Sequence, residues 1–159
     1  MAAKLWWLIQ KDLWSEFRSR RVWPTMIVFG IAVVLVFAMQ MDLLPEQKRQ
    51  MGGSLLWLAI FFAGTLVMDW SFASEREDGC WESLLLYPVS PATIYLAKLV
   101  VNVVWMAALE CVLIPLFVVL SDVPLLTRPG AMLLVALLGN LGVGAVGTLL
   151  SALGTGISK

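Results

Sequence analysis

The sequence contains no histidine and only two cysteines, Cys80 and Cys111. Histidine is the commonest general base near neutral pH and a frequent ligand of metals and haem iron, so its absence removes those roles from the chain. The two cysteines lie far apart, one in a charged stretch and one deep in an apolar run, and we expect no disulfide between them. No cluster of ligand residues has the spacing of a metal site, so we expect the chain to bind no metal.

Catalytic motifs are also missing. The sequence has no Ser–His–Asp set, no Cys-x-x-Cys pair and no glycine-rich phosphate loop followed by lysine. We therefore expect that the chain is not an enzyme and binds no cofactor, and that any ATP hydrolysis it depends on takes place in a separate subunit. The 11 basic and 11 acidic residues give a formal net charge of zero, which argues against nucleic acid as a partner.

Apolar residues dominate the chain. They make up 60% of it, and charged residues only 14%, whereas soluble domains contain roughly 45–50% and about 25%. The apolar residues form blocks long enough to cross a bilayer, which takes about 20 residues each. We therefore predict an all-α, polytopic helical membrane protein, with residues 1–159 forming one membrane domain in contact with the lipid bilayer.

The pattern of apolar and polar residues divides this domain into segments. We expect an N-terminal interfacial amphipathic helix and four transmembrane helices, with a cytoplasmic amphipathic coupling helix between the second and the third. The expected boundaries are 4–22 for the interfacial helix, 24–41, 53–73, 91–120 and 131–153 for the spans, 74–90 for the coupling segment and 42–50 for a polar loop. Lysine and arginine are concentrated in the first segment, so the positive-inside rule places the N-terminus in the cytoplasm. Four spans then place the coupling segment and the C-terminus there as well.

The expected interfacial helix has two different faces. Its apolar stripe consists of Leu5, Ile9, Leu13 and Phe17. Lys11 and Arg18 fall on another face, and Trp14 supplies a ring suited to the headgroup layer. We expect this helix to lie flat on the membrane, and either to help dock a partner or to act only as the basic flank that sets topology.

A charged segment separates the second and third spans. Its acidic residues precede a run of leucines and two prolines, which is typical of a short helix at the membrane face. In such a helix the acids point toward water and the leucines toward lipid or neighbouring spans. We interpret the segment as a docking surface for a partner ATPase rather than a bare linker. The expected docking residues are Glu75, Glu77, Asp78, Gly79, Glu82, Leu84 and Leu85.

One acid is expected inside the membrane. Glu110 follows Lys98 by twelve residues, so it lies about 18 Å deeper in a helix, whereas Lys98 is near enough to the start of its span to extend its amine to the interface. An ionised carboxylate near the bilayer centre is costly, so Glu110 must be protonated, paired or facing a polar cavity. Pro115 can open the backbone beside it. Glu110 is therefore either a hydrogen-bonded packing residue or part of a substrate path.

The fourth span is rich in small residues. Gly144, Gly147, Thr148 and Ser151 share a helix face with Asn140. Small residues let helices approach closely, and the amide of Asn140 can form a hydrogen bond across such a contact. We favour packing within the chain for this face, with a homodimer interface as the alternative.

The charged segment and the spans resemble a known family. The segment and the start of the third span are similar to those of permease subunits of type 2 ABC exporters. The matching residues there are Asp78-Gly79, Glu82, Leu84 to Leu86, Pro88 and Ala97-Lys98. Further matches, Ile114-Pro115-Leu116 in the third span and Leu138-Gly139 with Gly147 in the fourth, make the chain most similar to the CcmB family, the haem exporter protein B of cytochrome c maturation. The resemblance extends over essentially the whole chain.

This resemblance implies a multi-pass permease subunit in the bacterial inner membrane. Its implied partners are a CcmA-like ATPase, CcmC-like and CcmD-like membrane proteins and the haem chaperone CcmE, with ATP on the ATPase and haem as cargo. Members of the family continue with two further helices after the fourth span, so the resemblance also implies a C-terminally truncated member. Two alternatives stay open: a type 2 ABC permease for a glycan, lipid or drug, and a membrane scaffold that transports nothing.

Overall fold

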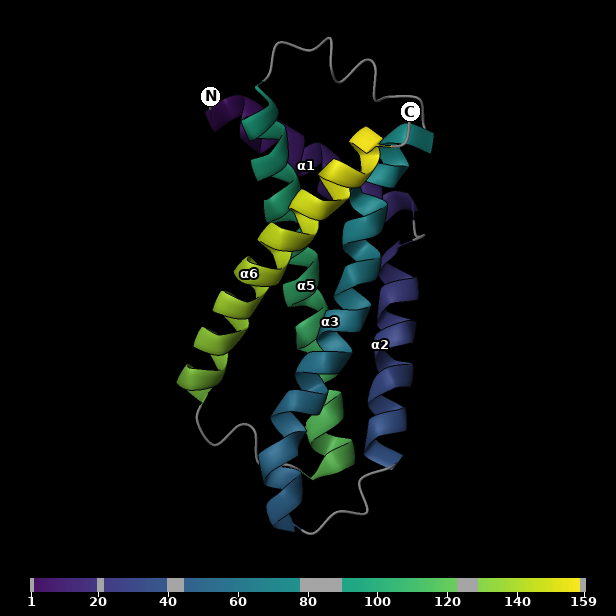
Figure 1. The fold of residues 1–159 in the computed structure, drawn as a ribbon, viewed down its shortest axis with the longest axis vertical. Helices are drawn as coiled ribbons and strands as arrows, with labels where there is room; N and C mark the ends of the chain where they lie inside the picture. The colour runs from purple at the N-terminus through teal and green to yellow at the C-terminus, as the bar shows by residue number, and fades with distance from the viewer. Residues whose placement is uncertain (1, 20–21, 40–44, 78–89, 123–128, 158–159) are drawn as a thin grey trace.

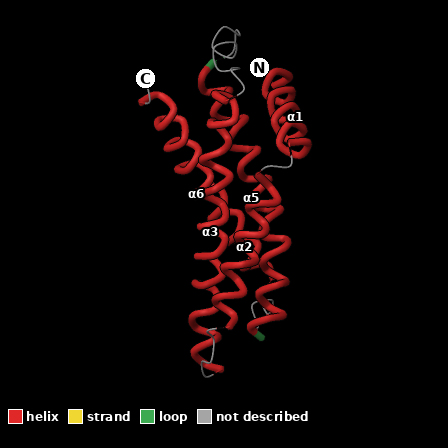
Figure 2. Tube along the Cα trace, turned by 90° about the vertical axis from the view of Figure 1, so that its right-hand side faces the viewer, coloured by secondary structure: helices red, strands yellow, loops and turns green. Residues whose placement is uncertain are grey.

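The computed structural model describes residues 2–19, 22–39, 45–77, 90–122 and 129–157. Its helices are α1 (Ala2–Ser19), α2 (Val22–Met39), α3 (Pro45–Glu77), α5 (Pro91–Ser121) and α6 (Pro129–Ile157). The last four run in alternating directions along an elongated bundle, and α1 lies at the end where α3 finishes and α5 begins (Figure 1). Figure 2, turned by 90°, shows α1 on the outside of that end. The expected all-helical fold is therefore confirmed.

α1 and α2 meet at a bend of 69°. Trp23 Nε1 donates a hydrogen bond to the carbonyl oxygen of Phe17 at 3.4 Å, and the two rings stack with their centroids 6.0 Å apart. Phe17 is 60% exposed and contacts the start of α2. Pro24 stands in the first turn of α2, where a missing N–H leaves no hydrogen bond unmade.

Two polar segments expected outside the spans are helical. α3 begins at Pro45, so residues 45–50 of the expected loop belong to the helix, and it continues to Glu77, so residues 74–77 belong to α3 instead of starting a separate coupling helix. Proline suits the first turn of a helix, and the alanine, glutamate, glutamine, lysine and arginine at the two ends are good helix formers. Helix propensity therefore extends α3 beyond its apolar part. The rest of the expected coupling helix, residues 78–89, lies outside the described residues.

The third span begins where the sequence predicts. Ser90 caps α5 by accepting a hydrogen bond from the backbone N–H of Thr93 on its side-chain oxygen at 3.3 Å, and Pro91 follows in the first turn. At the other end Asp122 adopts a left-handed conformation with φ 52°, and its N–H donates to the carbonyl of Val118 at 3.1 Å. α5 continues through Pro115, so the proline removes one backbone hydrogen bond without ending the helix.

The apolar core lies where α2, α3 and α5 meet. Its buried residues are Met26, Val34, Leu56, Ala59, Ile60, Ala63, Met68, Met106, Leu109, Leu113 and Phe117. Gly30 on α2 permits the close contact of these helices, because an added Cβ there would lie only 2.8 Å from Leu113 Cδ1. The buried face of α6 is different, since it consists of Asn140, Gly144 and Thr148. α6 therefore joins the bundle through small and polar groups, and it presents its leucines outward.

Helices α5 and α6 are the clearest membrane-span candidates. Within the described ranges, two helices are long and apolar enough to cross a membrane, Pro91–Ser121 and Pro129–Gly154, and the bent pair of α1 and α2 makes a third if it is counted as one span. A shorter apolar stretch, Gln50–Leu66, lies within α3. Most of the large side chains on α6 are exposed, as expected for a helix that contacts lipid.

Candidate functional site

A buried ion pair joins α1 to α5. Lys98 Nζ lies 3.1 Å from Asp12 Oδ2, and the two side chains are only 4% and 7% exposed. Leu8 and Ile9 of α1 pack beside the pair against the same turn of α5. Because two charges are withdrawn from water together, their mutual attraction has to offset a large desolvation cost, which requires close geometry. The contact therefore fixes α1 at one position along α5.

This pair corrects two expectations for the N-terminal region. Lys98 does not extend its amine to the membrane surface, because the carboxylate of Asp12 holds it inside the protein. The buried face of α1 contains Leu8 and Asp12, which the expected stripe omitted, and α1 packs on α5 along that face. The signal for Asp12 was present in the sequence, since it follows Leu5 and Leu8 at helical spacing and so places an acid on the apolar face.

The three residues predicted to mark the interfacial helix lie on the exposed side of α1. Lys11 and Arg18 are exposed, and Trp14 is 69% exposed. Lys11 and Trp14, with Trp7 and Gln10, line a shallow surface depression of about 440 Å³. Tryptophan and lysine side chains that project from one helix are suited to the headgroup layer of a membrane, so the exposed face keeps the predicted chemistry.

The predicted docking residues divide between two parts of the chain. Glu75 and Glu77 lie in the last turns of α3. Asp78, Gly79, Glu82, Leu84 and Leu85 lie outside the described residues, so their predicted role is not tested. The end of α3 and the start of α5, which flank this segment, lie at the same end of the bundle as α1 (Figure 1). The described part of the predicted docking segment, at the end of α3, therefore shares one end of the protein with the N-terminal helix.

Glu110 and Asn140, the two residues predicted as an intramembrane polar site, are brought together. Asn140 Nδ2 donates a hydrogen bond to Glu110 Oε2 at 3.0 Å, between α6 and α5, and both residues are buried. The second carboxyl oxygen, Glu110 Oε1, is buried and has no hydrogen-bond partner among the described residues. One oxygen of the acid thus accepts a hydrogen bond that joins α5 to α6, while the other has no donor among the described residues.

Two more polar contacts join α5 to α6. Asn102 Nδ2 donates to Thr148 Oγ1 at 2.9 Å, and both side chains are fully buried. Tyr95 donates its hydroxyl to the carbonyl oxygen of Ala145 at 3.0 Å. Between helices that face lipid, such bonds add to van der Waals packing, because the hydrophobic effect contributes little there. The polar face predicted for the fourth span is therefore used within the chain.

The glycines of α6 permit its close contact with α3. A Cβ at Gly139 would overlap the ring of Trp57, and one at Gly147 would overlap the side chain of Met68. Nothing lies within 4 Å of a Cβ placed at Gly142, which is on the exposed side of the helix. This arrangement agrees with the preferred interpretation of the small-residue face, packing within the chain.

Replacing Gly139 with valine is expected to lower the free energy of unfolding by about 1 kcal/mol, at the low end of the range for overpacking. The added side chain displaces the Trp57 ring, but that ring borders an open groove into which it can move. Thermal unfolding of the purified protein in detergent measures the change. Gly142→Val is the matched control, and equal destabilisation by both variants would show that the Trp57 contact is not the cause.

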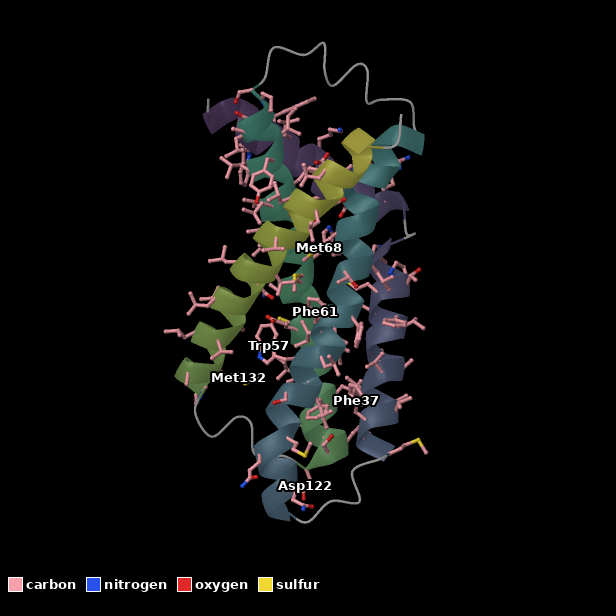
Figure 3. The ribbon with its side chains drawn as sticks, viewed as in Figure 1. Phe37, Trp57, Phe61, Met68, Asp122 and Met132 are labelled. Atoms are coloured by element: carbon pink, nitrogen blue, oxygen red, sulfur yellow. The ribbon has the colours of Figure 1, made fainter. Side chains whose placement is uncertain are left out.

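An open groove of about 890 Å³ lies between α3, α5 and α6. Trp57 and Phe61 of α3, Ile114 of α5 and Met132 of α6 line it, and Glu110 is the only acidic residue in its described lining. Figure 3 shows Trp57 and Met132 in the space where the first turns of α6 stand apart from α3. The groove therefore combines an apolar wall with one polar group at depth.

The comparisons with known proteins agree on one family. The sequence model of the family described as CcmB protein matches residues 3–159. Heme exporter protein B of Pseudomonas aeruginosa is 26% identical over 152 residues, which cover 96% of this chain and 68% of the relative. Heme exporter protein B of Escherichia coli K12 is 23% identical over 101 residues, which cover 64% of this chain and 45% of the relative. No solved structure gives a significant match.

Proposed function

This chain belongs to the CcmB family, and we propose on that premise that it is a membrane subunit of an ABC exporter that serves haem export in cytochrome c maturation. The observation that carries the proposal is the family match over nearly the whole chain. In this proposal a separate CcmA-like ATPase hydrolyses ATP, CcmC-like and CcmD-like proteins share the membrane complex, and CcmE receives the haem. The chain itself contributes transmembrane structure and a docking surface, and no catalytic group.

The proposed topology has four spans, formed by α2, α3, α5 and α6, with the N-terminus in the cytoplasm of a bacterial inner membrane. The described helices alternate in direction, so the start of α1, the end of α3, the start of α5 and the end of α6 lie at the same end of the bundle (Figure 1). Basic residues are concentrated in the N-terminal segment, which supports placing that end in the cytoplasm. A soluble ATPase would meet the protein there.

The proposed coupling step acts on the ends of two spans. A partner that moves the segment at 78–89 would move the end of α3 and the start of α5, because both are covalently attached to it. The pair formed by Asp12 and Lys98 ties α1 to α5 seven residues after the start of that helix. Motion imposed on the start of α5 would therefore carry α1 with it.

Neutralising the acids of the docking segment tests this proposal. The variant carries Glu77→Gln, Asp78→Asn and Glu82→Gln, and we expect it to bind the partner ATPase at least about tenfold more weakly, a change of about 1.4 kcal/mol. The reason is that each substitution preserves size and removes a charge that the ATPase surface would meet. Binding is measured with the co-expressed ATPase by titration in detergent, together with the stimulation of ATP hydrolysis.

The matched control is Asp122→Asn, which removes one acid at the opposite end of the bundle (Figure 3). Asparagine tolerates the left-handed backbone of Asp122, so the control adds no strain. Unchanged binding and unchanged stimulation in the triple variant would reject the docking assignment. Binding that survives without any ATP-dependent change would instead favour a scaffold.

A further inference from the structure

The groove between α3, α5 and α6 has the dimensions of a ligand site. Its volume of about 890 Å³ falls within the roughly 300–1,000 Å³ of small-molecule pockets, which are mostly apolar with a few placed polar groups. Along α3 it extends from Gln50 to Phe61, about 16 Å at the rise of an α-helix. An elongated molecule with one polar end would match this shape.

The polar end of the groove is an unsatisfied acid. Glu110 lines the groove and is only 6% exposed, and its Oε1 atom accepts no hydrogen bond from the described residues. The other oxygen is held by Asn140, which fixes the orientation of the carboxyl group. A buried acceptor without a donor costs free energy. A ligand whose N–H group donates a hydrogen bond to the carboxyl of Glu110 removes that cost, which favours its binding.

The residues that line the groove favour a ligand whose N–H donor carries a positive charge. Trp57 and Phe61 place two aromatic rings along the groove, and none of the described residues that line it is a lysine or an arginine. An ammonium group gains both from the carboxylate and from the faces of aromatic rings. A carboxylate would meet Glu110, and no basic residue in the described lining would compensate for the repulsion. This charge pattern separates the groove from a path for haem, which carries carboxylates.

We propose that the groove binds a hydrophobic organic amine, with its ammonium group at the carboxyl of Glu110 and its apolar chain along Trp57 and Ile114. The inference does not depend on the proposed function, because it concerns one site of the isolated chain. The ligand inferred here is a cation, whereas haem, the proposed cargo, carries carboxylates.

Three probes with the same ten-carbon chain test the proposal: radiolabelled decylamine, decanol and decanoate. Each is titrated onto the purified full chain, immobilised in dodecyl maltoside, and binding is read by scintillation proximity. We expect saturable binding of decylamine, at least about tenfold tighter than that of decanol or decanoate. Glu110→Gln is expected to remove this preference, because the amide carries no charge and cannot pair with an ammonium group.

Glu16→Gln is the matched control, since Glu16 lies on α1 and does not line the groove. It is expected to keep the preference for decylamine. If Glu110→Gln does not fold, Ala136→Phe decides, because it fills the groove from α6 without changing the acid, and it is expected to abolish binding. The proposal is overturned if Glu110→Gln keeps the preference, if decanol binds the wild type as tightly as decylamine, or if Ala136→Phe binds decylamine normally.

Discussion

Replacing Lys98 with methionine is expected to lower the free energy of unfolding by about 3 kcal/mol, because Asp12 then keeps a buried carboxylate without its closest cation. The Lys98 amine lies 3.1 Å from that carboxylate, and both side chains are almost completely buried. Methionine has a similar length and an apolar stem, so little packing is lost with the charge. Thermal or denaturant unfolding of the purified protein in detergent measures the change.

Lys11 provides the matched control for this prediction. Its amine lies 3.4 Å from the same carboxylate, but its side chain is 39% exposed, and exposed pairs contribute less than about 1 kcal/mol. Lys11→Met is therefore expected to change stability little. The double variant Asp12→Leu with Lys98→Met is expected to recover most of the loss, since an apolar pair of similar volume replaces the ion pair without a desolvation cost. A double variant as unstable as Lys98→Met alone would contradict this account.

Replacing Asn140 with leucine is expected to lower the free energy of unfolding by about 2 kcal/mol, because the buried carboxyl of Glu110 then has no described partner on either oxygen. Leucine has the same branching and the same number of side-chain heavy atoms as asparagine, so the loss of the hydrogen bond is the main change. The average hydrogen bond between membrane helices is worth only about 0.6 kcal/mol. The higher figure applies here because an acid, rather than a neutral group, loses its donor.

A double-mutant cycle isolates the contribution of this contact. Glu110→Leu is combined with Asn140→Leu, and the double variant is expected to be more stable than Asn140→Leu alone, since no buried acid is then left unpaired. Asn102→Leu is the comparison at the second polar contact, where the lost partner is a neutral hydroxyl. We expect a loss of about 1 kcal/mol there. Additive effects at Glu110 and Asn140 would show that the two side chains do not interact.

The sequence was sufficient to predict the five described helices, and it placed the start of α5 at the observed residue. The apolar blocks, Pro91 with its preceding serine, and the glycines of the fourth span each depend on local chemistry, which acts within a few residues. The prediction was wrong at both ends of α3, because helix propensity continues past the point where hydropathy falls. Hydropathy locates the part of a helix that can enter a membrane, and it does not locate the end of the helix.

The partners of the buried polar groups could not be predicted. Lys98 was expected to reach the membrane surface, yet it pairs with Asp12, which is 86 residues earlier in the chain. Glu110 and Asn140 were both singled out, but nothing in their spacing showed that they would bond to each other. Such contacts depend on the rotation and crossing of α1, α5 and α6, and those are set by the packing of all the side chains between them.

The sequence by itself therefore determined that the chain is a helical membrane protein of limited charge, with a charged segment between two apolar blocks and an acid placed deep in a span. These properties follow from composition and from periodicity along one helix at a time. Only the tertiary structure decided which acid meets which base, that one oxygen of Glu110 has no donor among the described residues, and that a groove opens beside it. The reason is physical: the cost of burying a polar group depends on the atoms that surround it, and those atoms come from other helices.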